Sequence, residues 1–154
     1  MKCPILFLNG TNDFAYPLDS YQKSYQLVKA PRTLSVRVRL PHGHIWTFGE
    51  VDAFIDCHLK DGDRLPEIGA MTLDADVVTA KVAAKGELKS AQLHYAVAAG
   101  PWQTRDWKSA PAEIKDGQVR AILPADRPLV YYVAVTDKRG LEVSSPHMES
   151  SGKK

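Results

Sequence analysis

This sequence has no long apolar run, little excess of charge of either sign and few cysteines. No run reaches the roughly 18 apolar residues that a membrane-spanning helix requires. The 20 Lys and Arg side chains nearly balance the 18 Asp and Glu side chains, for a formal net charge of +2, so no basic field indicates nucleic-acid binding. The 2 cysteines cannot build a disulfide framework. We therefore expect no membrane span, no nucleic-acid partner and no disulfide-stapled fold.

The composition that is present is typical of globular domains. Hydrophobic residues make up 44% of the 154 residues and charged residues 25%, which is ordinary usage for such proteins. A chain of this length forms one domain or two small ones. A polar segment at residues 60–69, punctuated by Gly and Pro, is typical of a linker. We therefore place one domain at residues 1–68 and a second at residues 69–154, which includes a frayed tail.

The first part alternates strand and helix patterns. The continuous apolar run at residues 4–8 predicts a buried strand of a parallel sheet, and a helix follows at about residues 19–28. Residues 34–40 alternate between apolar and polar, which predicts a half-exposed edge strand. In the next helix, Thr47 and Glu50 fit the capping box T-x-x-E. Because a single crossover joins the two strands, we expect them to be parallel neighbours.

The second part has the shorter period of β-strands. Each short β-type run is separated from the next by turn-forming residues such as Asp116-Gly117. This spacing favours an antiparallel sandwich of the immunoglobulin or fibronectin-III type. The runs cover residues 77–83, 91–98, 112–115, 118–123 and 129–136.

A carboxylate follows the first strand directly. Asp13 lies in the turn-rich loop Gly10-Thr11-Asn12-Asp13, and catalytic groups of open α/β sheets gather at the carboxyl ends of strands. A carboxylate there can orient an imidazole and stabilise its cation. The alternative is that Asp13 only closes an Asx-turn.

Two histidines follow the second strand, in Pro41-His42-Gly43-His44. Gly43 permits a sharp turn, so His44 can reach over the end of the sheet, and an imidazole suits general-base work near neutral pH. Neighbouring strands lie ~4.8 Å apart, so we expect His44 to pair with Asp13. We interpret His42 as a surface histidine of the connecting loop.

The order of these elements and motifs over about residues 3–60 resembles the last two strands and helices of an α/β-hydrolase. More narrowly, it is similar to prolyl-oligopeptidase-related and dienelactone-hydrolase or acetyl-xylan-esterase-like members, some of which carry a β-sandwich after the catalytic domain. The resemblance implies that Asp13 is the acid and His44 the base of a catalytic triad. It further implies hydrolysis of ester or peptide bonds, no cofactor, and an extracytoplasmic parent protein.

The sequence departs from this family at the nucleophile. No G-x-S-x-G elbow is present, and the oxyanion-hole segments of the family also lie upstream of the acid and base. We therefore expect a C-terminal fragment of a serine hydrolase that is inactive alone. Its first strand should lack a partner on one side, and an open strand edge favours self-association. The expected partner is a second copy of the chain or the missing N-terminal part.

Other side chains suggest different functions. Trp102 and Trp107 could form an aromatic platform for a polysaccharide, or one or both could fill the core. The chain would then be a carbohydrate- or protein-binding module, and a third alternative is an assembly protein that oligomerises through its open sheet edge. The histidines and cysteines show no metal-ligand spacing, so we expect no metal. Cys3 and Cys57 could pair, although free thiols are commoner.

Overall fold

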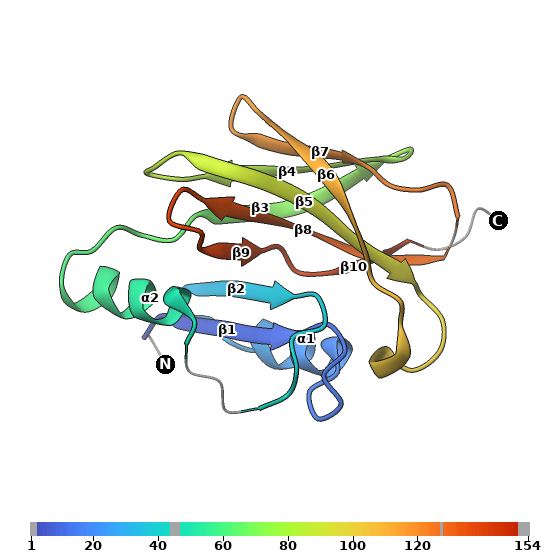
Figure 1. Cartoon of the computed structure of the whole chain (residues 1–154), viewed down its shortest axis with the longest axis horizontal. Helices are drawn as coiled ribbons and strands as arrows, with labels where there is room; N and C mark the ends of the chain where they lie inside the picture. Colours follow the sequence, from blue (N-terminus) through green and yellow to red (C-terminus); the bar gives the residue numbers. More distant parts are fainter. Residues whose placement is uncertain (1–2, 44–46, 127, 151–154) are drawn as a thin grey trace.

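A computed structural model describes residues 3–43, 47–126 and 128–150 of the chain (Figure 1). Strands account for 45% of the structure and helices for 16%. The N-terminal part contains two strands and two α-helices. These elements are β1 (Ile5–Gly10), α1 (Leu18–Gln26), β2 (Arg32–Arg37) and α2 (Gly49–Leu59).

Strands β1 and β2 pair in parallel, with Ile5 opposite Arg32 and Asn9 opposite Val36, so the predicted parallel neighbours are confirmed. Helix α1 covers β1 through aromatic contacts, because the ring of Phe7 lies 5.9 Å from those of both Tyr21 and Tyr25. A parallel pair has its two carboxyl ends at the same edge of the sheet. The loops that follow β1 and β2 therefore lie side by side.

The rest of the chain forms one 8-stranded antiparallel sheet, in the order β10-β8-β5-β6-β7-β4-β3 with β9 also paired to β8. The sheet curls, and the strands enclose a shared core (Figure 1). A 3₁₀ turn at Trp102–Thr104 lies between β5 and β6. The strands are β3 (Glu67–Asp74), β4 (Val77–Ala83), β5 (Leu88–Val97), β6 (Lys108–Lys115), β7 (Gln118–Ile122), β8 (Leu129–Asp137), β9 (Glu142–Ser144) and β10 (Met148–Ser150).

The predicted fold class is wrong. The structure is mostly β, and it does not show the two strand–helix units of an α/β-hydrolase, because β1 and β2 form a sheet of 2 strands within the part of the chain that the structure describes. The second part is one curled sheet rather than the two separate sheets of an immunoglobulin-like sandwich. Strand β6 joins the halves, since its residues 108–112 pair with β5 and its residues 113–115 pair with β7. Local periodicity predicted β4 to β8 but not β3, β9 or β10, and it carries no information on which strand bridges the two halves.

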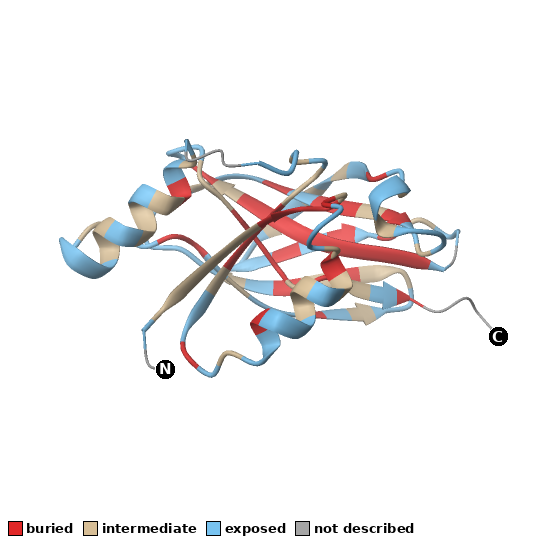
Figure 2. Ribbon diagram, turned by 90° about the horizontal axis from the view of Figure 1, so that it is seen from below, coloured by how far each residue is buried: buried red, intermediate tan, exposed pale blue. Residues whose placement is uncertain are grey.

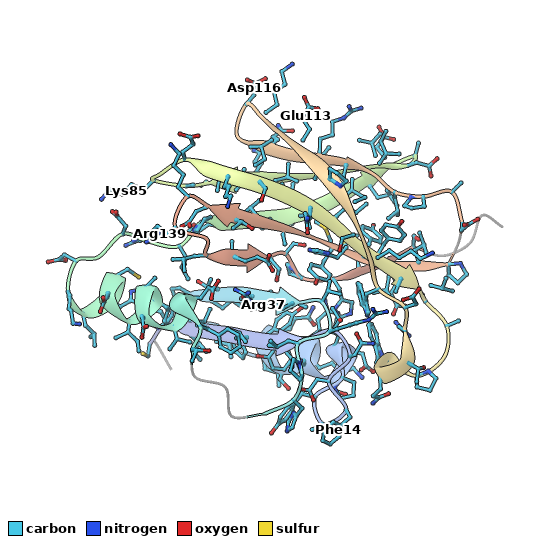
Figure 3. The ribbon with its side chains drawn as sticks, viewed as in Figure 1. Phe14, Arg37, Lys85, Glu113, Asp116 and Arg139 are labelled. Atoms are coloured by element: carbon cyan, nitrogen blue, oxygen red, sulfur yellow. The ribbon has the colours of Figure 1, made fainter. Side chains whose placement is uncertain are left out.

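Strand β2 lies alongside β9, so the two sheets meet edge to edge (Figure 1). The backbone N–H of Val36 donates to the Ser144 hydroxyl at 2.9 Å. Glu50 of α2 is buried at 2% exposure, and its carboxylate accepts hydrogen bonds from the Arg37 guanidinium and from the backbone N–H of Glu142. Figure 3 labels Arg37 beside this junction. Hydrogen bonds and an ion pair thus fix the small sheet against the large one.

The predicted capping box of α2 is wrong. The N-cap residue is Phe48, and no side chain caps the helix. Glu50 faces the junction instead, because its carboxylate is held by Arg37 and by the backbone of β9.

Among the described residues, neither helix has the length and apolarity that a membrane crossing requires.

Candidate functional site

The loops after β1 and β2 approach each other at Gly10. A Cβ atom at this position would collide with the carbonyl oxygen of Leu40. Only glycine permits this contact without moving the backbone of one loop. The close approach places Asp13, three residues after Gly10, next to the loop that carries His42.

Asp13 is 7% exposed, and its carboxylate has hydrogen-bond partners on both oxygens. Oδ1 accepts from the backbone N–H groups of Ala15 and Tyr16, each at 2.8 Å, which is an Asx-turn. Oδ2 lies 2.9 Å from Nδ1 of His42. Burial raises the pKa of Asp13, and the hydrogen bonds from His42, Tyr16 and Ala15 lower it by a larger amount. The net pKa therefore lies below the usual value for an aspartate, and the carboxylate stays ionised.

The His42 ring is held between two aromatic rings. The centroid of Phe14 lies 4.8 Å from that of the imidazole, and the centroid of Tyr16 lies 5.8 Å from it. The His42 side chain is 37% exposed. Among the described residues its Nε2 has no hydrogen-bond partner. The imidazole is therefore oriented through Nδ1 and open to other molecules through Nε2.

The structure brings Asp13 together with His42, which we had interpreted as a surface histidine. His44 lies outside the described residues, so its pairing with Asp13 stays a prediction. The sequence does carry a signal for His42, because either histidine that flanks Gly43 follows the second strand closely enough to reach the first loop. Choosing between them required the path of the loop, which no local pattern specifies.

That path depends on a left-handed residue. Arg39 has a φ of 54°, an unfavourable backbone conformation for a residue with a side chain. Its backbone N–H donates to the hydroxyl of Thr11 at 2.9 Å, and its guanidinium pairs with Asp106. Thr11 is fully buried. The turn that aims His42 at Asp13 is thus supported by the β1 loop and by the large sheet.

Asn12 ties the site to the connection between β5 and β6. Its side-chain amide donates to the carbonyl oxygens of Gln103 at 3.0 Å and Arg105 at 2.9 Å. Its own oxygen accepts from the Thr11 hydroxyl at 2.7 Å. No local pattern predicts this role of Asn12, because its partners are backbone atoms about 90 residues away.

The two tryptophans do not form a common platform. Trp107 is 4% exposed and its ring packs 5.5 Å from that of Tyr132, so it belongs to the core. Trp102 is half-buried, and the Arg105 guanidinium covers its face at 3.6 Å from the ring centroid. A flat ligand stacking on Trp107, or on the face of Trp102 that Arg105 covers, would have to displace protein atoms.

The described residues contain no group of 3 or more His, Cys, Asp or Glu that could hold a metal ion. Cys3 is exposed, Cys57 is half-buried, and each is a free thiol. Cys57 Sγ donates to the carbonyl of Phe54 at 3.2 Å. Neither cysteine is part of the Asp13–His42 arrangement.

A cleft of about 330 Å³ opens beside the Asp13–His42 pair. Its apolar walls come from the ends of β1 and β2 and from the start of α2. They include Leu8, Leu40, Pro41, Phe48 and Val51.

No protein-family model matches this chain, and no curated protein is significantly similar to it.

The chemistry of the site is therefore argued from the geometry of Asp13 and His42 alone. A carboxylate–imidazole pair can accept a proton from a nucleophile through the outer nitrogen of the imidazole. Among the described residues, no hydroxyl or thiol is hydrogen-bonded to that nitrogen.

Proposed function

We propose that Asp13 and His42 are the acid and base of a hydrolytic site that cleaves ester or peptide bonds. The nucleophile is supplied by a segment outside the described residues. One observation carries the proposal: a buried, ionised carboxylate is hydrogen-bonded to Nδ1 of a partly exposed imidazole whose Nε2 is open. The resemblance of the loop motifs to the C-terminal portion of serine hydrolases supports Asp13 as the acid, although it implies His44 rather than His42 as the base.

The roles follow from the hydrogen-bond directions. Asp13 accepts the Nδ1 proton of His42, which leaves the lone pair on Nε2. Nε2 takes the proton of an attacking hydroxyl as that hydroxyl adds to the carbonyl carbon, and the same proton later passes to the leaving group. Asp13 stabilises the intervening imidazolium. The chain needs no metal for these steps.

The tautomer of His42 tests this assignment directly. We expect ¹⁵N NMR at pH 8 to show His42 with its proton on Nδ1. In Asp13→Asn the new amide donates toward Nδ1, so the proton should move to Nε2. Asp116→Asn in the distant β6–β7 turn is the matched control and should leave His42 unchanged.

Two outcomes would overturn the assignment to His42. One is a His42 tautomer that does not respond to Asp13→Asn. The other is a locked tautomer at His44 that responds to Asp13→Asn, which would make His44 the base, as the family resemblance implies.

The nucleophile is tested by activity. The chain alone should turn over p-nitrophenyl acetate no faster than background, and turnover that His42→Gln abolishes would place the nucleophile within the chain. When the chain is expressed together with the coding sequence that precedes it, an in-frame G-x-S-x-G and ester hydrolysis that drops by about 100-fold or more in His42→Gln are expected.

A second candidate function is assembly through β1. Within the described residues β1 pairs only with β2, and its apolar residues 5–8 are only half-buried, as the view from below shows (Figure 2). An unpaired strand edge can accept a strand of another chain. Light scattering at micromolar concentration should then show a dimer. A monomer at these concentrations would exclude assembly through this edge.

A further inference from the structure

The cleft beside Asp13 and His42 has the size of a small-molecule site. Its volume of about 330 Å³ falls at the lower end of the range for ligand-binding clefts. It lies at the carboxyl ends of β1 and β2, and both members of the acid–base pair line it. A group bound in the cleft is therefore adjacent to His42.

Two other polar side chains of the cleft are bonded within the protein. The amide of Asn9 donates to the carbonyl of Tyr16 at 2.8 Å, and the hydroxyl of Tyr21 donates to the carbonyl of Leu8 at 3.2 Å. Burial raises the pKa of Tyr21 to about 12, so the phenol is uncharged at neutral pH. A ligand with many hydroxyls or a charge would leave its polar groups without partners here, which costs free energy.

Large apolar rings extend the cleft toward solvent. Phe14 is 69% exposed and Tyr16 is 58% exposed, although both flank His42. Phe14 projects from the surface away from the curled sheet (Figure 3). Exposed aromatic rings that adjoin an apolar cleft indicate a binding surface for apolar ligands.

We infer that this cleft binds an uncharged apolar group, aromatic or branched aliphatic, of an ester. The assignment of that group to a substrate rests on the proposed function. The binding itself does not, because it depends on the walls of the cleft and not on the proton transfer.

The probe is methyl benzoate, an uncharged aromatic ester, titrated into the whole chain and followed by NMR. We expect saturable shifts of the Leu40 and Val51 methyl signals. Val51→Asp places a charge in the wall and should weaken binding by about tenfold or more. Ile122→Asp adds the same charge at an exposed position of β7 (70% exposed) and should leave binding unchanged.

The selectivity of the cleft is tested with methyl β-xyloside, a polar ligand of similar size, which should produce no saturable shifts. Binding of the xyloside as tight as that of the benzoate, no saturable binding of the benzoate, or equal benzoate affinity in Val51→Asp would each overturn the inference. The tautomer experiment separates the two proposals, because a failed tautomer experiment together with intact benzoate binding to the unchanged chain would refute only the proposed function.

Discussion

At the residue scale, the geometry of the candidate site depends on residues that hold the two loops together as well as on the two side chains proposed to react. Gly10 permits the contact with Leu40, and Thr11 holds the left-handed Arg39. Asp13 is aimed at His42 by two backbone N–H groups of its own loop. Each of these residues acts by fixing the distance between two loops, so the geometry of the pair is sensitive to changes that remove no reactive group.

Gly10→Ala should therefore separate the acid from the base. The added methyl group meets backbone at Leu40, which cannot rotate away, so we expect a loss of about 2 kcal/mol in the free energy of unfolding and loss of the locked His42 tautomer. Urea denaturation and ¹⁵N NMR measure the two effects. Gly86→Ala is the control, because a Cβ there meets nothing within 4 Å. Equal stability of the two variants would contradict the role given to Gly10.

At the element scale, turns and strands follow local chemistry closely. Asp116 and Gly117 both have positive φ, 50° and 70°, as expected for an Asp-Gly hairpin turn, and the predicted strand at 77–83 matches β4 in full. Two histidines are buried in the large sheet and beside it. His94 of β5 bonds to Ser109 at 2.8 Å, and His147 packs against the edge of Trp102.

These histidines predict acid sensitivity. Burial lowers the pKa of His94 and of His147 from 6.5 to about 4, so both are neutral in the folded chain. Their unfolded forms gain protons first as the pH falls below about 6.5, and the folded state loses stability down to about pH 4. At pH 5 each of the two histidines should lower the free energy of unfolding by on the order of 1–2 kcal/mol relative to neutral pH.

Urea denaturation at pH 7 and pH 5 measures this loss. His94→Gln and His147→Gln should each reduce the difference between the two pH values, and the double variant should reduce it most. A difference that is the same in the wild type and in the double variant would contradict the assignment.

At the scale of the whole molecule, the small parallel sheet is attached to the large curled sheet through a shared apolar core, which includes Leu18 and Val36, and through polar contacts. Glu50 is central to them, because its buried carboxylate binds both Arg37 of β2 and the backbone of β9. Asn12 and Arg39 add contacts to the β5–β6 connection. The acid–base pair is thus positioned by the large sheet as well as by its own loops.

Glu50→Ala should destabilise the chain by about 2–4 kcal/mol, because it leaves the partly buried Arg37 guanidinium and the N–H of Glu142 without their acceptor. Thermal unfolding measures the change. Asp52→Ala, an exposed acid of the same helix, should change stability by less than about 0.5 kcal/mol. A similar small effect in Glu50→Ala would show that the junction does not depend on this carboxylate.

The sequence by itself determined strands β1, β2 and β4 to β8, the turns between them and the adjacency of β1 and β2, because period, turn chemistry and a single crossover are local properties. It did not predict β3, β9 or β10. Only the tertiary structure showed that His42 contacts Asp13, that Glu50 faces the junction rather than capping its helix, and that β6 joins the strands into one curled sheet. These features depend on contacts between residues far apart in the chain. The free energies of such contacts are set by burial and by charge partners, which local patterns do not encode.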